Sequence, residues 1–211
     1  MDGLQALGAV VRVPRILDHG ADFIVLEQLD LKRNGNWAAL ARMLAKMHRQ
    51  TGPRFGWHRD NWIGATPQIN TWCDDWCEFW QERRMRPQLE LARKNGFDIP
   101  DPPKLTHNPR PSLLHGDLWN GNAGFIEDGP VIFDPAVYYG DREADLAMTE
   151  LFGGFPARFY DAYNEAFPLP AGYETRKHFY NLYHLLNHLN LFGGGYLAQV
   201  RSTLRLLRNA L

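Results

Sequence analysis

The amino-acid sequence predicts an α+β protein in which a few short strands accompany a mainly helical carboxy-terminal region. Three features of the chain lead to this prediction. Short runs of β-forming residues occur near the amino end and again between residues 113 and 133. Apolar side chains recur at helical spacing in residues 40–47 and 71–94. Beyond residue 133 we predict helices to the end of the chain.

The composition restricts the class of protein. The chain has 211 residues, of which 45% are hydrophobic and 22% charged, as in one or two ordinary globular units. Its formal net charge of −1 comes from interspersed charges of both signs, so we expect no nucleic acid as partner. No apolar run approaches the ~20 residues that span a bilayer, and the amino terminus lacks the pattern of a secretion signal. We therefore expect a cytoplasmic protein with no membrane contact.

Two cysteines, Cys73 and Cys77, lie four residues apart in a stretch that we predict to be helical. This spacing would place both thiols on one helix face and provides no disulfide framework, which is consistent with a reducing compartment. Two cysteines are also too few for a structural zinc site, which usually needs four ligands.

The amino-terminal region is predicted to contain the tail of a helix from Met1 to Ala9 and two strand-like runs. These runs are Val10 to Val13 and, with more β-forming residues, Phe23 to Leu29. Unpaired strand edges favour pairing with another chain. We therefore expect self-association through the edges at Val10 to Val13 and at Phe23 to Leu26.

Two helices should follow. The first carries apolar side chains at residues 40, 43, 44 and 47 and is predicted to end near Gly52-Pro53. A polar, aromatic loop containing Trp57 and Trp62 leads to a long helix from about Thr71 to Lys94. Residues 99–111 contain five prolines and no periodic pattern, which is typical of a rigid connector.

The stretch after the connector is predicted to form a strand and a hairpin. Leu113 to His115 is a short apolar strand that enters a loop. Two further β-like runs, Ala123 to Ile126 and Val131 to Phe133, flank a turn that contains Asp128-Gly129 and therefore predict a hairpin. The helices beyond it should be broken at Gly153-Gly154, with Pro156, and again at Pro168 and Pro170.

Three polar residues in this stretch have the types that phosphoryl transfer requires. Asp117 lies on the loop, Asn122 follows five residues later, and Asp134 stands at the far end of the hairpin. One carboxylate must orient the acceptor hydroxyl and receive its proton, which we assign to Asp117. Hard oxygen ligands must hold magnesium against the triphosphate, which we assign to Asn122 and Asp134. The spacing from Asp117 to Asn122 matches a kinase catalytic loop.

The alternative interpretation is that Asp117, Asn120 and Asn122 only cap turns, as such residues often do. Any one of them alone would favour that interpretation. The combination of strand, loop, hairpin and second acid favours phosphoryl transfer, because three chemically constrained positions coincide with the expected structural context.

The chain resembles the fructosamine kinase, or ketosamine-3-kinase, family. The resemblance rests on residues 115–122 (HGDLWNGN), 133–147 (FDPAVYYGDREADLA), 191–195 (LFGGG), 60–64 (DNWIG) and 66–68 (TPQ). It implies a protein-kinase-like fold and ATP- and Mg²⁺-dependent phosphorylation of a sugar hydroxyl on a ketosamine, as a small molecule or on a glycated protein. A close alternative is an aminoglycoside- or choline-kinase-like enzyme with another acceptor.

The resemblance also implies further site residues. Glu27, Gln28 and Leu29 would form the hinge between two lobes, where backbone groups meet the adenine. Trp119 would lie beside the sugar site. His115 and Asp145 would support the catalytic loop, Asp145 from the following helix.

Several parts of a complete kinase are not found in the sequence. They are a glycine-rich strand–turn–strand over the phosphates and a strand lysine paired with a helix glutamate. We interpret residues 1–30 as a remnant of an amino-terminal lobe with its hinge, and residues 31–211 as the helical lobe. We expect weak ATP affinity and low or absent turnover for these residues alone. A non-catalytic kinase fragment is the alternative from a different functional class.

Other signals have simpler explanations. His184 and His188 have the four-residue spacing of a metalloprotease helix, but Leu185 occupies the place of the required glutamate, so we predict a packed helix. Most tryptophans are expected in the core, and the exceptions are Trp62 and Trp119. Residues 201–208 alternate arginine with leucine, which predicts an amphipathic helix that docks on its own domain.

Overall fold

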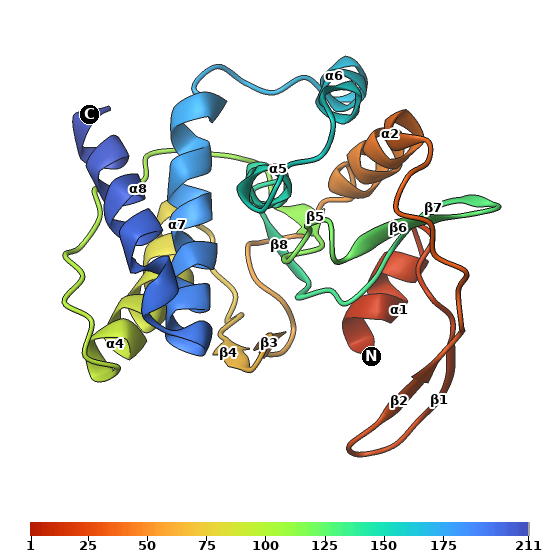
Figure 1. Cartoon of the computed structure of the whole chain (residues 1–211), viewed down its shortest axis with the longest axis horizontal. Coiled ribbons are helices and arrows are strands. Elements are labelled where there is room, and N and C mark those ends of the chain that lie inside the picture. The colour runs from red at the N-terminus through yellow and green to blue at the C-terminus, as the bar shows by residue number, and fades with distance from the viewer. Residues whose placement is uncertain (211) are drawn as a thin grey trace.

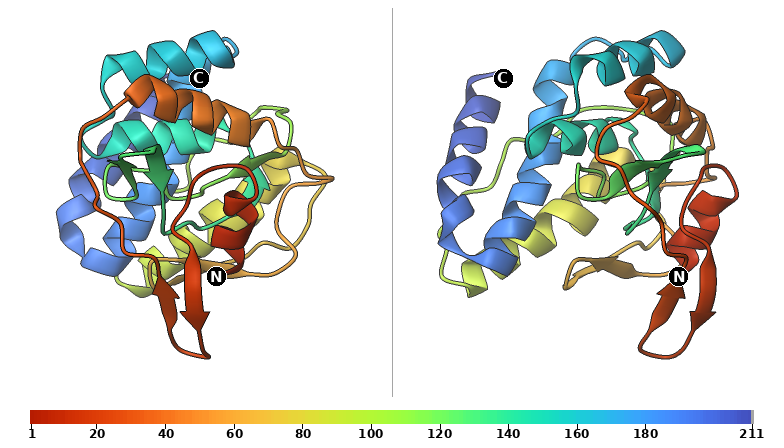
Figure 2. Two further views of the ribbon diagram at one scale, coloured as in Figure 1. Left: turned by 90° about the vertical axis from the view of Figure 1, so that its right-hand side faces the viewer. Right: turned by 45° about the vertical axis from the view of Figure 1, so that its right-hand side comes forward.

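The computed structural model describes residues 1–210 and has the α+β architecture that the sequence predicts (Figure 1). At the amino end, helix α1 (Asp2–Gly8) is followed by an antiparallel two-stranded ribbon of β1 (Ile16–His19) and β2 (Ile24–Leu26). The ribbon projects from the body of the molecule in every view (Figures 1 and 2). Both faces of most of the ribbon are therefore in contact with solvent.

One strand prediction in this region is wrong. Val10 to Val13 forms a turn and an extended segment with no strand partner, and Val11 and Val13 are buried against the core. These valines serve packing, so the exposed edge that we expected there does not exist. The exposed apolar residues of the ribbon are Leu17, Phe23, Ile24 and Val25.

Helix α2 (Trp37–His48) begins where the sequence supplies a cap. The Asn36 side chain accepts a hydrogen bond of 2.9 Å from the Ala39 backbone N–H, which satisfies one donor of the first turn. Its buried face includes Leu40, Leu44 and Met47, as their helical spacing predicts. α2 packs against α6 on one face and against the β5 and β7 region on the other.

The polar loop before the long helix contains a hairpin that the sequence did not reveal. Strands β3 (Asn61–Ile63) and β4 (Thr66–Gln68) pair antiparallel around Gly64, which has a φ of 59°. Three-residue strands are too short to show a clear alternation of apolar and polar residues. The exposed Trp62 lies on this hairpin, in agreement with the prediction for that side chain.

The long helix begins later than predicted, because Asp75 caps it with a 2.7 Å bond from the Glu78 N–H. It runs as α3 (Trp76–Phe79), a π-helical segment η1 (Trp80–Met85) and α4 (Arg86–Lys94). Cys73 therefore lies before the helix and Cys77 within it, and both are free thiols. The prediction that the two cysteines share one helix face is wrong.

The connector from residue 97 to residue 111 forms no helix or strand, as its prolines predict. β5 (Ser112–Leu114) then pairs antiparallel with β8 (Tyr138–Gly140). Between them, β6 (Ala123–Ile126) and β7 (Gly129–Ile132) form the predicted hairpin, with Ile126 opposite Gly129. β8 was missed, because the region after residue 133 was predicted to be helical throughout.

The remaining elements are helical and broken at the predicted glycines and prolines. They are α5 (Glu143–Leu151), α6 (Ala157–Ala166), α7 (Tyr173–Phe192), the 3-10 turn η2 (Gly194–Tyr196) and α8 (Leu197–Asn209). Val200, Leu204 and Leu207 of α8 are buried, which confirms that this basic helix docks on its own chain. No helix within residues 1–210 is both long and apolar enough to cross a membrane.

Candidate active site

The loop between β5 and β6 brings the predicted residues to the middle of the molecule. Its second residue, Gly116, has a φ of 82°, a conformation that favours glycine. A Cβ atom there would lie 2.1 Å from the Ala136 carbonyl oxygen, so the position also requires close backbone approach. The loop is therefore held tightly against the segment that follows β7.

Asp145, on the buried face of α5, anchors the start of this loop. Its Oδ2 accepts a 2.7 Å hydrogen bond from the His115 N–H, and its Oδ1 accepts a 2.8 Å bond from the Gly116 N–H. Burial alone would raise the pKa of Asp145, but the His48 ring and the Gly116 N–H outweigh it and hold the pKa below its usual range. A buried carboxylate with three N–H donors fixes the backbone direction on entry to the loop.

His48 is the third donor to Asp145, and it was not predicted as a site residue. Its Nε2 lies 3.1 Å from Asp145 Oδ2 and its Nδ1 lies 2.7 Å from the Tyr163 hydroxyl. Burial lowers the pKa of His48, so the neutral ring donates to Asp145 and accepts from Tyr163. This one side chain joins α2, α5 and α6 beneath the loop.

Three hydrogen bonds hold the loop to the segment that carries Asp134. The His115 ring donates from Nε2 to the Phe133 carbonyl at 3.0 Å, because its Nδ1 accepts from the Asp117 N–H at 3.3 Å. The Phe133 N–H donates to the Asn122 carbonyl at 3.0 Å, and the Ala136 N–H donates to the His115 carbonyl at 2.8 Å. Asp134 therefore lies between two residues that are bonded to the two ends of the loop.

Asp117 lies partly exposed at the centre of this arrangement. The Asn122 side chain donates from Nδ2 to the Asp117 carbonyl oxygen at 2.8 Å and to its carboxylate at 3.3 Å. Burial raises the pKa of Asp117 to about 7, and the negative charges of Asp134 and Asp145 act in the same direction. A carboxyl group with such a pKa can accept and release a proton near neutral pH.

Asp134 has two properties that distinguish it from a structural acid. It is exposed, and its φ of 57° makes it the one residue other than glycine in the left-handed region among residues 1–210. Such conformations cost energy and concentrate at functional sites. Together with the amide oxygen of the buried Asn122, the Asp134 carboxylate offers the hard oxygen donors that Mg²⁺ prefers.

The predicted hinge residues lie directly after β2. The Glu27 carboxylate pairs with the Arg12 guanidinium at 2.7 Å and with the Arg15 guanidinium at 3.3 Å. Hydrogen bonds from the Arg12 side chain and the Arg15 N–H lower the pKa of Glu27 to about 2. Within the described chain, the backbone groups of Gln28 and Leu29 make no hydrogen bond, so they are available to a ligand.

Trp119 stands two residues after Asp117 and begins a row of aromatic side chains. Its ring contacts Phe152 at 6.3 Å between centroids, and Phe152 contacts His188 at 4.5 Å. The row continues to Tyr196 and Phe192, and Phe192 and Trp119 are exposed. Apart from Trp119, these residues were missed, because they come from three separate segments whose proximity no local pattern predicts.

His184 is enclosed in α7, in agreement with the prediction of a packed helix. Burial lowers its pKa to about 3, so the ring is neutral. His188 lies one turn further on, and its Nδ1–H donates to the His184 carbonyl at 2.9 Å. The two histidines therefore do not form a metalloprotease pair.

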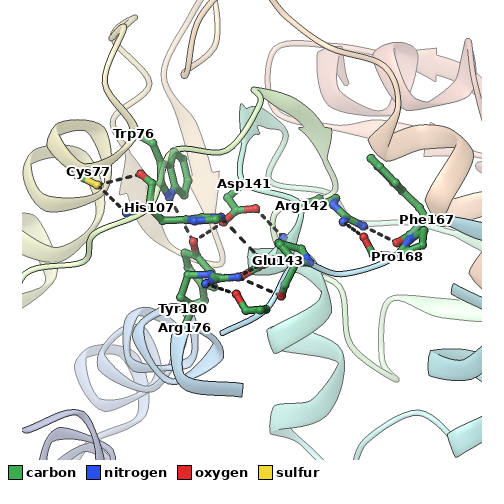
Figure 3. Close-up of polar contacts among 12 residues, drawn as sticks. Trp76, Cys77, His107, Asp141, Arg142, Glu143, Phe167, Pro168, Arg176 and Tyr180 are labelled. Atoms are coloured by element: carbon green, nitrogen blue, oxygen red, sulfur yellow. Dashed lines mark hydrogen bonds and ion pairs between the residues drawn. The ribbon is translucent and has the colours of Figure 1, made fainter. Parts of the chain in front are cut away.

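A second buried polar cluster lies where the connector meets α5 (Figure 3). His107 Nε2 lies 3.4 Å from Asp141 Oδ2 and 4.0 Å from Glu143 Oε1, ligand types that can hold a metal ion. Arg176, however, donates bonds of 2.8 and 2.7 Å to Glu143, and the Tyr180 hydroxyl donates to Asp141. Because a guanidinium already neutralises Glu143, we interpret the cluster as an ion-pair network that fastens the connector to α5 and α7.

Comparison with known proteins identifies a family of matching proteins. A family model described as fructosamine kinase matches residues 1–209. A protein of Synechocystis named a probable ketoamine kinase is 49% identical over 96% of this chain and 75% of its own length. The chloroplastic protein-ribulosamine 3-kinase of Arabidopsis thaliana is 44% identical over 95% of this chain and 68% of its own length.

Solved structures agree with this result. A crystal structure from Haemophilus somnus assigned to a fructosamine-3-kinase superposes with a TM-score of 0.90 at 32% identity, over 98% of this chain and 77% of the other. A choline/ethanolamine kinase family protein of Mesorhizobium loti shares the fold, with a TM-score of 0.56 at 12% identity, over 98% and 77% of the two chains. The kinase-like fold predicted from the sequence is therefore confirmed.

Proposed function

This chain belongs to the fructosamine kinase family, and from that premise we propose that it transfers the γ-phosphoryl group of ATP to a sugar hydroxyl of a ketosamine. The acceptor is a small ketosamine or one carried by a glycated protein. The observation that supports this most is the arrangement of Asp117, Asn122 and Asp134 around one loop, held by Asp145 from below.

Asp117 is the proposed general base. The acceptor hydroxyl would donate to its carboxylate, which orients the oxygen for attack and receives the proton as the phosphoryl group transfers. Its raised pKa suits this exchange, because the group is largely ionised slightly above neutral pH and can still hold a proton. The 3.3 Å bond from Asn122 to the carboxylate restricts its orientation.

Asn122 and Asp134 are the proposed magnesium ligands. Bound there, the ion would neutralise charge on the triphosphate, which is the chief electrostatic demand of phosphoryl transfer. The residues fit this role, because the Asp134 carboxylate is exposed and the Asn122 side chain keeps its oxygen free of hydrogen bonds within residues 1–210. Gln28 and Leu29 offer backbone groups to the adenine, and Glu27 holds the hinge through its two arginines.

Trp119 is the proposed wall of the acceptor site. It is exposed, stands two residues after Asp117 and continues into the aromatic row with Phe152 and His188. Aromatic faces pack well against the apolar face of a sugar ring, and the Trp119 indole is open to solvent. Cytoplasmic location, self-association through the β1–β2 ribbon and the division of the chain at residue 30 stay predictions.

A radiometric assay with fructoselysine, ATP and Mg²⁺ tests the activity. In a chimera that carries the amino-terminal segment of the Synechocystis relative, Asp117→Asn removes the base with little change of shape and should lower turnover at least ~100-fold. Asp128→Asn, in the exposed turn of the β6–β7 hairpin, is the matched control and should leave turnover unchanged. Equal turnover of the Asp117 variant and the parent would contradict the assignment.

The same assay tests the expectation of weak activity for residues 1–211 alone. The chain spans 75% of the Synechocystis relative, so a chimera with the amino-terminal segment of that relative is the natural comparison. We expect the chimera to bind ATP more tightly and to turn over faster. The turnover of the chimera with an aminoglycoside and with choline is compared with its turnover on the ketosamine. This comparison shows which of the three is the acceptor. A chimera inactive on every acceptor would favour a non-catalytic role.

A further inference from the structure

A cavity of about 820 Å³ adjoins the catalytic loop on the side of α2 and α6. Its wall contains Trp119 and Asn120 of the loop, the segment Leu31–Asn34 that follows the hinge, and the turn that leads into α6. The volume is in the range of sites for small molecules and peptide side chains, about 300–1,000 Å³. The carboxylates of Asp117 and Asp134 do not line it, but Gly121, Ala123 and Phe133, the chain neighbours of Asn122 and Asp134, do, so the cavity borders the proposed metal site.

The side chains around this cavity are positively charged. Lys32, Arg33 and Arg158 line it, and no aspartate or glutamate does. Across residues 1–210, none of these three side chains makes an ion pair or a hydrogen bond within the chain. Some other arginines are paired, for example Arg12 with Glu27 and Arg176 with Glu143.

This local charge does not follow from the composition. The chain as a whole has a formal net charge of −1, so a cavity lined by three cations and no acid departs from the average. α6 also begins here, and the positive end of its dipole adds to the same potential. Three unpaired cations around one cavity concentrate anions there.

The position of the cavity connects it with the acceptor. Trp119 forms part of its wall and stands two residues after Asp117, so the two Cα atoms lie no more than about 7 Å apart. A molecule whose hydroxyl meets Asp117 can therefore reach the cavity past the Trp119 ring. The amine of a ketosamine is itself a cation at neutral pH, so the cavity would repel it. An anionic group of the acceptor that fits the cavity therefore lies beyond the amine.

We propose that this cavity recognises carboxylate side chains that flank a glycated lysine, which makes acidic peptides and proteins the preferred acceptors. The proposal rests on the function proposed above and names the substrate class within it. Arg33 and Arg158 contact the carboxylates from opposite segments of the wall, and Lys32 adds charge between them.

The test is peptide binding to the chain at low ionic strength, measured by fluorescence anisotropy. Three labelled peptide sequences have a central lysine flanked by glutamate, by glutamine or by lysine. Each sequence is used with the central lysine glycated and with it unmodified. The glutamate peptides should bind about tenfold more tightly than the glutamine peptides, and the lysine peptides more weakly still. Arg33→Glu together with Arg158→Glu should abolish or reverse this order. Arg201→Glu with Arg205→Glu, on the exposed face of α8, changes the net charge equally and should preserve it.

Each other outcome either overturns the proposal or contradicts only the proposed function. Equal affinity for the three peptides would overturn it, as would loss of the order in the α8 variant. Two outcomes would assign the cavity to the nucleotide and would also overturn the proposal. One is that ATP displaces the unglycated glutamate peptide. The other is that the Arg33 and Arg158 variant shows a raised KM for ATP and no other change. Absence of ketosamine phosphorylation by the chimera, with the order of binding intact, would contradict the proposed function and leave the cavity's specificity supported.

Discussion

The catalytic loop and the β1–β2 ribbon are both non-helical segments, but they are held in opposite ways. The loop is fixed by buried hydrogen bonds, with Asp145 joined to His115, Gly116 and His48. The ribbon is solvent-exposed, and its base is held by ion pairs of Glu27 with the partly exposed Arg12 and the exposed Arg15. Buried charge-assisted bonds resist water and salt, whereas exposed pairs do not.

This difference shows where the geometry of the site originates. Asp117 and Asn122 lie on the loop, and Asp134 is bonded to it through its neighbours Phe133 and Ala136. All of these contacts come from the helical part of the chain. The positions of the three polar residues should therefore not depend on the ribbon, and three substitutions can test this.

Asp145→Asn should have the largest effect. An asparagine presents an NH₂ group to one of three N–H donors, so at least one buried bond becomes a repulsive contact. We expect the free energy of unfolding to fall by about 3–5 kcal/mol, because an unsatisfied buried donor costs about 1–3 kcal/mol and the remaining bonds lose the charge of the carboxylate. Urea denaturation followed by circular dichroism measures the loss. Asp161→Asn, an exposed acid on α6, is the control, and an equal loss in both variants would show that Asp145 has no special role.

Asp117→Asn should act in the opposite direction on stability. Between pH 4 and about 7 the folded protein keeps a proton on Asp117 that the unfolded chain releases, so this group contributes less stability as pH rises through that interval. Above pH 7 the ionised carboxylate is unfavourable in the fold, and an amide removes that penalty.

The expected gain is about 1–3 kcal/mol at pH 8, below the full value of the shift because Asp117 is partly solvated. At pH 4 the variant and the parent should be equally stable. Thermal or urea unfolding without nucleotide or metal, at both pH values, measures this. A variant less stable than the parent at pH 8 would mean that the carboxylate is a structural residue and not a catalytic one.

The local elements could be predicted from the sequence because their signals are local. Asn36 and the apolar spacing that follows it define α2, and the turn at Asp128-Gly129 defines the hairpin. The spacing of Asp117, Asn122 and Asp134 indicated a phosphotransferase for the same reason, because one loop and one hairpin position them.

The rest could not be predicted because it depends on contacts between distant segments. His48 meets Asp145 across 97 residues, and nothing in α2 distinguishes it from a surface histidine at a helix end. β8 exists only because β5 lies beside it, and its three residues have no strand pattern of their own. The basic cavity likewise combines Arg33 with Arg158, from two segments that meet where α2 packs against α6.

Glu27→Gln should have the smallest effect and confine it to the ribbon. Its carboxylate is ionised above pH 4.5, and the stabilisation from Arg12 and Arg15 is lost as pH falls toward about 2. The amide removes the charge at every pH, so the base of the ribbon should open more often at neutral pH. Hydrogen exchange at the Glu27 N–H, which bonds the Arg15 carbonyl at 2.9 Å, should quicken. High salt should quicken it in the parent as well, since exposed pairs are screened.

Exchange at Gly116 should not change, because its bond to Asp145 belongs to the buried network. Faster exchange at both amides would show that the ribbon and the loop open together, and the two regions would then form one cooperative unit.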